Sequence, residues 1–189
     1  MKLSQLEGTT WRTASFWHQS FLRNAGATTV AMPWNNNITD ALRAGQLNGL
    51  MVNLDSGYDI HAQREAPYIY SSPALWLGHV YLLVMNKDTW NAMSGQDREA
   101  IYRAANITEK QLGATLDKGL ASLTATLEKE GAQFHLLSRG ELEKWQRVTQ
   151  YQAVQREWVI QQERKGNADA GTLMREVSQL LEGSARKQP

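Results

Sequence analysis

Three segments within residues 9–58 decide the fold: TTWRTAS (9–15), TTVAM (28–32) and LNGLMVNL (47–54). Each is short and rich in residues that favour β-strands, and amphipathic runs separate them. Strands that alternate with helices at intervals of roughly 20 residues are typical of βαβ units with parallel pairing. The sequence therefore predicts an α/β fold whose core is a βαβαβ parallel sheet.

The two intervening runs carry helix signals. Apolar residues from Phe16 to Leu22 form a one-sided face that ends at Gly26, a typical position for ending a helix. The run from Ile38 to Gly45 repeats apolar or small residues at three- and four-residue spacing, after asparagines suited to a helix N-terminus. Both runs are therefore predicted to be helices.

Beyond the third segment the pattern changes gradually from strand to helix. We expect a polar loop at Asn53–Tyr58, a fourth strand at Tyr68–Tyr70, and a strand at Leu75–Met85 that is apolar enough to be buried on both faces. A capping-box pattern at Ser94–Asp97 then begins a helical stripe that continues to Gly131. A helix of this length is unusual in a globular protein and often spans two lobes.

The remainder is predicted to be mostly helical. A short strand, Gln133–Leu137, precedes a second capping box, Ser138–Glu141, which begins a helix that reaches Trp158. A break at Gly166–Gly171 separates it from a last helix, in which apolar residues recur at helical spacing between positions 173 and 181.

Composition excludes several classes of protein. The chain has 189 residues, of which 42% are hydrophobic and 21% charged, with a formal net charge of +1. These values allow a buried core and argue against a disordered tail or a nucleic-acid-binding protein. No apolar run reaches the roughly 18 residues of a membrane span. The absence of cysteine excludes disulfides, thiol catalysis and cysteine-based metal sites.

No motif for catalysis or metal binding is recognisable. The four histidines show no spacing expected of zinc ligands, and the sequence has no GxSxG nucleophile motif, phosphate-binding loop or dinucleotide fingerprint. We therefore expect no enzyme activity, no cofactor and no metal, and we assign the histidines to the surface or to packing. They are His18, His61, His79 and His135.

Arg12 is the strongest candidate for a functional residue. It lies in the middle of the first predicted strand, between Trp11 and Thr13, where the side chain is expected to be interior. A buried guanidinium needs a partner, because an unpaired buried charge is very costly. That partner can be an internal carboxylate, or it can be a ligand carboxylate held by two parallel hydrogen bonds. The residues alone leave both possibilities open.

Further candidates follow the predicted strands. Trp34 comes after the second strand and Asn53 after the third, and ligands of open α/β sheets bind beyond the carboxyl ends of the strands. Trp34 can supply an apolar wall and Asn53 a polar contact, although each can equally close a core or a turn. Asp55, Tyr58 and Trp76 are weaker candidates of the same type.

Four motifs in order resemble the solute-binding receptors of TRAP (tripartite ATP-independent periplasmic) transporters. The family pattern LxGxxIR is matched by LEGTTWR (6–12), and GAxPVxMxF by GATTVAMPW (26–34). The pattern ALQxGxVDG is matched by ALRAGQLNG (41–49), and WDxLSxEDQxxI by WNAMSGQDREAI (90–101). Each motif alone is weak, but four at the family's spacing are fairly specific. The resemblance covers positions 3 to about 181.

The resemblance implies a periplasmic receptor that delivers a small organic acid to a membrane permease, without nucleic acid as a partner. In the family, the arginine at the position of Arg12 pairs with the substrate carboxylate, and the aromatic residue at the position of Trp34 lines the pocket. An asparagine beyond the third strand often contacts the ligand. Here the family spacing falls on Val52, so that Asn53 requires a shift of one residue, which in a strand reverses the side chain's face.

The resemblance also implies a domain organisation. We expect a periplasmic-binding-protein-like, ligand-gripping lobe at residues 1–74, an inter-lobe strand and connection at 75–93, and helices that pack back on the lobe at 94–189. The family's receptor has two lobes, and this chain begins where its second lobe begins. Met1 and Lys2 are not followed by the apolar segment of a signal peptide.

Other functions are kept as alternatives. The chain can be a truncated stand-alone interaction protein that keeps the fold without ligand binding. By fold analogy alone it can also be the effector domain of a transcription regulator, although no DNA-binding segment is recognisable. If elements of a first lobe are absent, apolar residues of the Leu75–Met85 strand lose their cover, which predicts a homodimer or a domain-exchanged oligomer.

Overall fold

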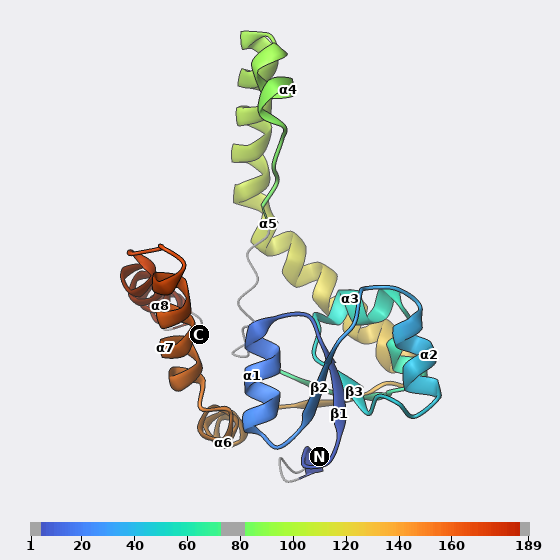
Figure 1. Ribbon diagram of the computed structural model, residues 1–189. Coiled ribbons are helices and arrows are strands. Elements are labelled where there is room, and N and C mark those ends of the chain that lie inside the picture. Colours follow the sequence, from blue (N-terminus) through green and yellow to red (C-terminus); the bar gives the residue numbers. More distant parts are fainter. Residues whose placement is uncertain (1–4, 73–81, 186–189) are drawn as a thin grey trace. The chain divides into compact units, whose positions relative to one another are not determined.

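The computed structural model describes residues 5–72 and 82–185 (Figure 1), and it divides into two compact units. The first unit comprises Met1–Leu77 together with Gln133–Pro189, and the second comprises Gly78–Ala132. The chain therefore leaves the first unit once and returns to it.

A three-stranded parallel sheet lies at the centre of the first unit. Its strands are β1 (Thr10–Thr13), β2 (Thr28–Ala31) and β3 (Gly49–Leu50), in the order β2-β1-β3. The predicted βαβαβ parallel arrangement is confirmed. The third strand, expected over eight residues from Leu47, is wrong in length, because only two of those residues pair with β1.

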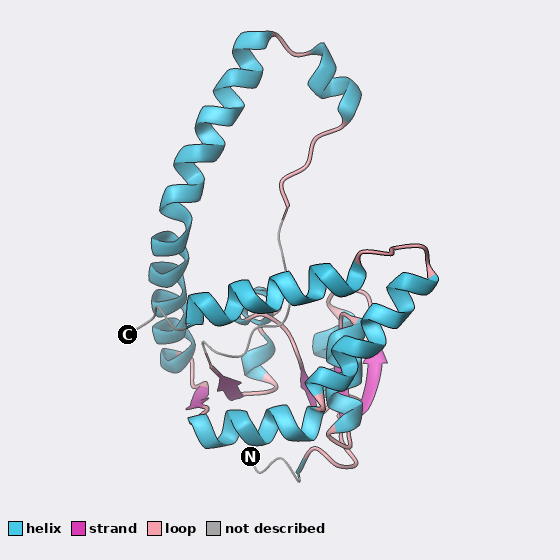
Figure 2. Ribbon diagram, turned by 90° about the vertical axis from the view of Figure 1, so that its left-hand side faces the viewer, coloured by secondary structure: helices cyan, strands magenta, loops and turns pink. Residues whose placement is uncertain are grey.

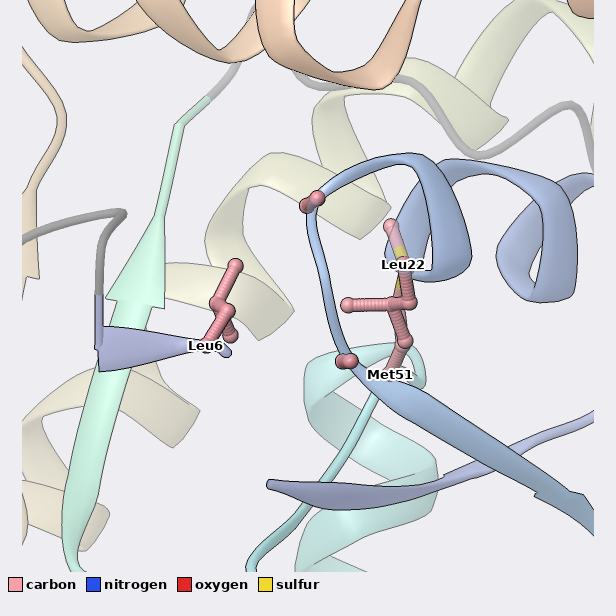
Figure 3. Packing of buried hydrophobic residues seen from close by; sticks show 5 residues of the cluster. Leu6, Leu22 and Met51 are labelled. Atoms are coloured by element: carbon pink, nitrogen blue, oxygen red, sulfur yellow. The ribbon is translucent and has the colours of Figure 1, made fainter. Parts of the chain in front are cut away.

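Helices cover both faces of this sheet. On one face, α1 (Phe16–Asn24) contributes Leu22 to a core that also contains Leu6 and Met51 (Figure 3). On the other face, α2 (Asn37–Arg43) contributes Ile38 to a second core. The other buried residues of the second core are Ala41, Leu42, Leu47 and Ala62.

The central strand requires a glycine on its neighbour. The ring of Trp11 in β1 lies over Gly49 in β3, where an added Cβ would come within 2.6 Å of the ring carbon Cζ3. Because that distance is far below van der Waals contact, the Trp11 ring lies against the sheet only if position 49 has no side chain.

The segment after β3 is helical, which corrects the predicted polar loop. Asn53 precedes helix α3 (Leu54–Asp59), and a short 3₁₀-helix, η2 (Ala62–Arg64), follows it. Asn53 is a preferred residue type for a helix N-terminus, and Asp55 supplies a negative charge in the first turn. These helix-start signals outweigh the turn-like composition of the segment.

A second, two-stranded sheet joins distant parts of the chain. Strand β4 (Tyr68–Ser71), predicted at Tyr68–Tyr70, pairs in parallel with β5 (Gln133–Leu136). Both strands belong to the first unit, and they flank the segment that contains the second unit.

The second unit contains a short helix, α4 (Lys87–Ala92), and a long one, α5 (Gly95–Lys129). The predicted long helix is confirmed as one continuous element of 35 residues, which Figure 2 shows among the helices. Ser94 begins it by accepting a hydrogen bond from the backbone of Asp97, and Trp90 of α4 contacts Tyr102 edge-on at 5.5 Å.

Three helices complete the first unit: α6 (Arg139–Thr149), α7 (Tyr151–Arg164) and α8 (Ala170–Ala185). The predicted capping box of Ser138 with Glu141 is present at the start of α6. The single helix expected to reach Trp158 is wrong, because Gln150 has a positive φ of 51° and separates α6 from α7. A left-handed residue ends the hydrogen-bond ladder of an α-helix.

The predicted strand at Leu75–Met85 lies partly outside the described residues. Its described part, Leu82 to Met85, forms no strand and has exposed side chains. Among the described residues, no helix is both long enough and apolar enough to cross a membrane.

Candidate functional site

Arg12 lies on the central strand of the three-stranded sheet, with a neighbour on each side. It is aligned with Val30 of β2 and with Leu50 of β3, both of which pack against the core beneath α2. Because strands cover both of its flanks and a helix layer covers its face, only 5% of the Arg12 surface is exposed. The prediction that Arg12 is interior is confirmed.

The guanidinium of Arg12 is held by the backbone rather than by an internal carboxylate. Its Nε and Nη2 atoms donate to the carbonyl oxygen of Met32, at 3.2 and 2.8 Å. Pro33 follows and stops the strand, so that the Met32 carbonyl lies just beyond the residues of β2. None of the ion pairs that the described residues form includes Arg12. Burial lowers the pKa of Arg12 from its ordinary value.

Trp34 covers the face of the same guanidinium. The carbon atom Cζ of Arg12 lies 5.0 Å from the centre of the Trp34 ring, within the range of a cation–π contact. Trp34 itself is 43% exposed, so that it forms a boundary between the buried cation and solvent. The structure thus brings two of the sequence-predicted candidates together.

One edge of the Arg12 guanidinium takes no part in the contacts with Met32 and Trp34. The Met32 carbonyl occupies the edge formed by Nε and Nη2, and the Trp34 ring lies over the face. The N–H groups of the other edge, formed by Nη1 and Nη2, lie in the plane of the group. Within the hydrogen bonds of the described residues, Nη1 of Arg12 has no acceptor. That edge has the shape that a carboxylate recognises with two parallel hydrogen bonds.

The remaining candidates belong to the segment after β3, at the same edge of the sheet. Parallel strands end at one edge, so that Asn53 follows β3 where Trp34 follows β2. Asp55 accepts a hydrogen bond from the backbone of Ser56, and Tyr58 contacts the His61 ring edge-on at 6.1 Å. Among the described residues, the hydrogen bonds and the ring contact of Arg12 go to Met32 and Trp34. Trp76 lies outside the described residues.

Two surface grooves lie elsewhere. One, of about 690 Å³, lies between α7 and α8 and is lined by residues such as Arg156, Val159 and Met174. The other, of about 480 Å³, follows the junction of α6 and α7. Neither is lined by Arg12 or Trp34, so that size alone does not locate the candidate site.

The burial of Thr13 was not predicted from the sequence. Thr13, beside Arg12 but on the opposite face of β1, is 1% exposed, and its Oγ1 makes no hydrogen bond among the described residues. His18 is fully buried within α1, and His135 lies 2.8 Å from Glu141 on the surface. The alternation of faces in β1 was a signal for the burial of Thr13. Within residues 5–72 and 82–185, no group of three or more acidic or histidine side chains is placed to hold a metal ion.

The family emerges from sequence comparison. The profile of the family "bacterial extracellular solute-binding protein, family 7" matches residues 1–159, which is most of the chain. The chain belongs to this family. This family comprises the TRAP solute-binding proteins. Its members are periplasmic, and they are binding proteins and not enzymes. The predicted relationship to the TRAP solute-binding receptors is therefore confirmed. Among curated proteins, none is significantly similar to this chain.

Solved structures of TRAP solute-binding proteins share the fold. One from Rhodoferax ferrireducens T118, in complex with benzoate, superposes with a TM-score of 0.78 at 21% identity, over 97% of this chain and 57% of that one. A marine metagenome protein specific for aromatic acids, in complex with metahydroxyphenylacetate, superposes with a TM-score of 0.77 at 20% identity, over 96% of this chain and 57% of that one. A second R. ferrireducens protein, with bound malonate, superposes with a TM-score of 0.74 at 20% identity, over 98% of this chain and 57% of that one. The chain thus spans little more than half the length of these proteins.

Proposed function

We propose that this chain acts in the periplasm as the solute-binding receptor component of a TRAP-type transporter. It binds a small organic acid through its carboxylate and presents it to a membrane permease. The proposal depends mainly on the Arg12 guanidinium. Met32 and Trp34 hold this group in place, and one of its hydrogen-bonding edges takes no part in these two contacts.

The fixed position of Arg12 supports recognition of a carboxylate. An arginine loses less side-chain freedom on binding when its guanidinium is already held, and this reduces the entropic cost of forming the ion pair. Partial burial strengthens the attraction to a carboxylate, because the pair is screened less by water than a surface pair. Benzoate, malonate and metahydroxyphenylacetate, which the similar proteins bind, all carry a carboxylate.

The other candidates receive supporting roles in this proposal. Trp34 forms an apolar wall beside the carboxylate, and its exposed ring surface can contact the rest of an aromatic or aliphatic acid. Asn53, Asp55 and Tyr58 supply polar contacts from the segment after β3. Trp76 is assigned to the same pocket on the basis of the sequence.

Isothermal titration calorimetry with benzoate, malonate and glucuronate tests the proposal. Arg12→Ala is expected to abolish binding, and Arg12→Lys to impair it, because an ammonium group cannot reproduce the planar fork of donors. Arg23→Ala is the matched control, since Arg23 is an exposed arginine of α1 that bonds Gln19 and Thr29. Binding that Arg12→Ala leaves unchanged contradicts the proposed role.

The affinity of the chain by itself is expected to be weak. Receptors with two lobes enclose the ligand between them, and an ion pair left in contact with water contributes only about 0–1 kcal/mol. A dissociation constant in the millimolar range for the best acid agrees with this expectation, whereas nanomolar binding contradicts it.

A second candidate is an interaction protein that keeps the fold without binding a solute. It is favoured by the position of the grooves, which lie along α6, α7 and α8 rather than at Arg12. Calorimetry distinguishes the two functions: heats of binding that depend on Arg12 support the receptor, and their absence for every acid supports the interaction protein. Self-association through Leu75–Met85 stays a prediction.

A further inference from the structure

The two residues that hold the Arg12 guanidinium are separated by a single proline. The carbonyl oxygen of Met32 accepts from Nε and Nη2 of Arg12, and the Trp34 ring lies over the guanidinium face. Pro33 stands between them in the sequence. All of these residues lie between the start of β1 and the turn that follows β2, so that the arrangement is complete within one short stretch of the chain.

The Met32 carbonyl is available to Arg12 because strand β2 has already ended. The pairing of β2 with β1 stops at Ala31, which is aligned with Thr13. In the part of the chain that the structure describes, the donors to the Met32 carbonyl are the two Arg12 nitrogens. The Met32 side chain packs against the second core, which anchors this residue. The direction of its carbonyl then depends on the backbone angle ψ of Met32.

Pro33 restricts the backbone on both of its sides. The ring of a proline fixes its own φ near −65° and confines the preceding residue to extended conformations, with ψ of about +120° to +160°. At Met32 this angle sets where the carbonyl points. Because peptide bonds are planar, ψ of Pro33 is then the one soft dihedral between that carbonyl and the Trp34 backbone. Any other residue at position 33 adds a second soft dihedral and widens the range of ψ at Met32.

We propose that Pro33 is a positioning residue for carboxylate binding: it aligns the Met32 carbonyl and the Trp34 ring on the guanidinium, which directs the Nη1–Nη2 edge toward the ligand. This inference rests on the proposed receptor function. Pro33 acts through its two neighbours, and its benefit is that a guanidinium held in advance loses less freedom when the ligand binds. If Pro33 only ends strand β2, its replacement changes stability but leaves the guanidinium in place.

Nitrogen-15 NMR of the arginine Nε–H groups reports on the guanidinium without any ligand. Near neutral pH an exposed Nε–H exchanges rapidly with water, whereas a buried, hydrogen-bonded one is protected. We expect a protected Arg12 signal in the unsubstituted chain, assigned by its loss in Arg12→Lys. In Pro33→Ala the signal should shift, and its exchange should accelerate by about 2- to 10-fold, the factor for loosening one held side chain. Pro33→Gly should have a larger effect, because glycine frees the backbone further.

Titration with benzoate, followed in the same spectra, gives the dissociation constant. We expect it to rise by about 2- to 10-fold in Pro33→Ala, and further in Pro33→Gly. The Pro33 side chain is exposed, so that neither substitution opens a cavity in the chain. Urea unfolding measures the stability of each variant separately.

Pro67→Ala is the matched control. Pro67 directly precedes strand β4, and its carbonyl oxygen also accepts a hydrogen bond, from the backbone of Gln133 at 2.8 Å. The substitution therefore removes the same kind of restriction elsewhere in the first unit. It should leave both the Arg12 signal and the dissociation constant unchanged.

The inference is overturned if Pro33→Ala and Pro33→Gly leave the Arg12 signal as it is in the unsubstituted chain, or if that chain shows no protected Arg12 signal. An equal effect of Pro67→Ala also overturns it, because the change then follows stability alone. Benzoate binding that Arg12→Ala leaves intact contradicts the receptor function instead. The spectra of the free chain still decide whether Pro33 positions the guanidinium, so that either proposal can fail alone.

Discussion

Replacing Arg12 with alanine should destabilise the fold by an amount that follows from its contacts. The Met32 carbonyl loses both of its Arg12 donors, and for this partly buried acceptor the loss costs at most about 1–3 kcal/mol, the range for a fully buried one. Loss of the cation–π contact with Trp34 adds about 0.5–2 kcal/mol. Removal of a partly desolvated charge offsets some of this cost. We therefore expect the free energy of unfolding to fall by about 2–4 kcal/mol.

Urea unfolding followed by circular dichroism measures this change. Arg12→Lys should give an intermediate loss, because an ammonium group can still donate to the Met32 carbonyl. Arg23→Ala, at an exposed arginine, should change the free energy of unfolding by less than about 1 kcal/mol. A double-mutant cycle of Arg12→Ala with Trp34→Leu should show a coupling energy of about 0.5–2 kcal/mol.

Unfolding of Arg12→Ala at the same urea concentration as the unsubstituted chain, or at a higher one, would refute a stabilising role of Arg12. In that case the Met32 and Trp34 contacts do not stabilise the fold, and Arg12 is a net cost that only a ligand offsets. A coupling energy near zero refutes the Trp34 contact alone.

Two further predictions concern residues away from the guanidinium. Thr13→Val should leave the free energy of unfolding unchanged or raise it by up to about 1 kcal/mol, because the buried hydroxyl has no hydrogen-bond partner among the described residues. A decrease of more than about 1 kcal/mol, measured by urea unfolding, contradicts this prediction. Hydrogen bonds from the Ser138 backbone and side chain, and then from His135, lower the pKa of Glu141 from 4.5 to about 2. The ionised Glu141 therefore stabilises the fold above pH 4.5, and this contribution is lost as the pH falls toward 2. Glu141→Gln should remove that part of the pH dependence in thermal melts, whereas Glu143→Gln on the same helix should retain it.

Much of the fold could be predicted from the sequence, because in many segments the local sequence signals agree with the structure that forms. The segments around Trp11, Val30 and Leu50 combine β-forming residues with helical runs between them, and all three pair in parallel. Ser138 and Glu141 form the capping box that their spacing predicts. The glycines Gly113 and Gly119 do not interrupt α5, since an isolated glycine lowers helix stability by only about 1 kcal/mol.

The errors arise where long-range contacts or single backbone angles decide the structure. The residues around Gln150 do not indicate its left-handed conformation, and the hydrogen bond that the Asn24 side chain donates to the Thr149 carbonyl joins residues far apart in the sequence. The short length of β3 reflects pairing that ends after Leu50. For the candidate site, the position of Arg12 in the middle of a predicted interior strand indicated its burial but not its partner, because residue types do not show which side chain a backbone carbonyl accepts from.

The parallel pairing of β4 with β5 has a consequence for the order in which the chain folds. On the ribosome, β1, β2 and β3 are all synthesised by residue 50, so that their sheet can form early. Strand β4 must wait for β5, and closing a loop of about 60 residues costs roughly 3–4 kcal/mol of chain entropy beyond a constant term. Since that cost grows only with the logarithm of loop length, evolution can lengthen or shorten the segment between the two strands at little energetic expense. We therefore expect the two-stranded sheet to form late in folding, and we expect loop-closure entropy to set only a weak limit on the length of the segment between β4 and β5.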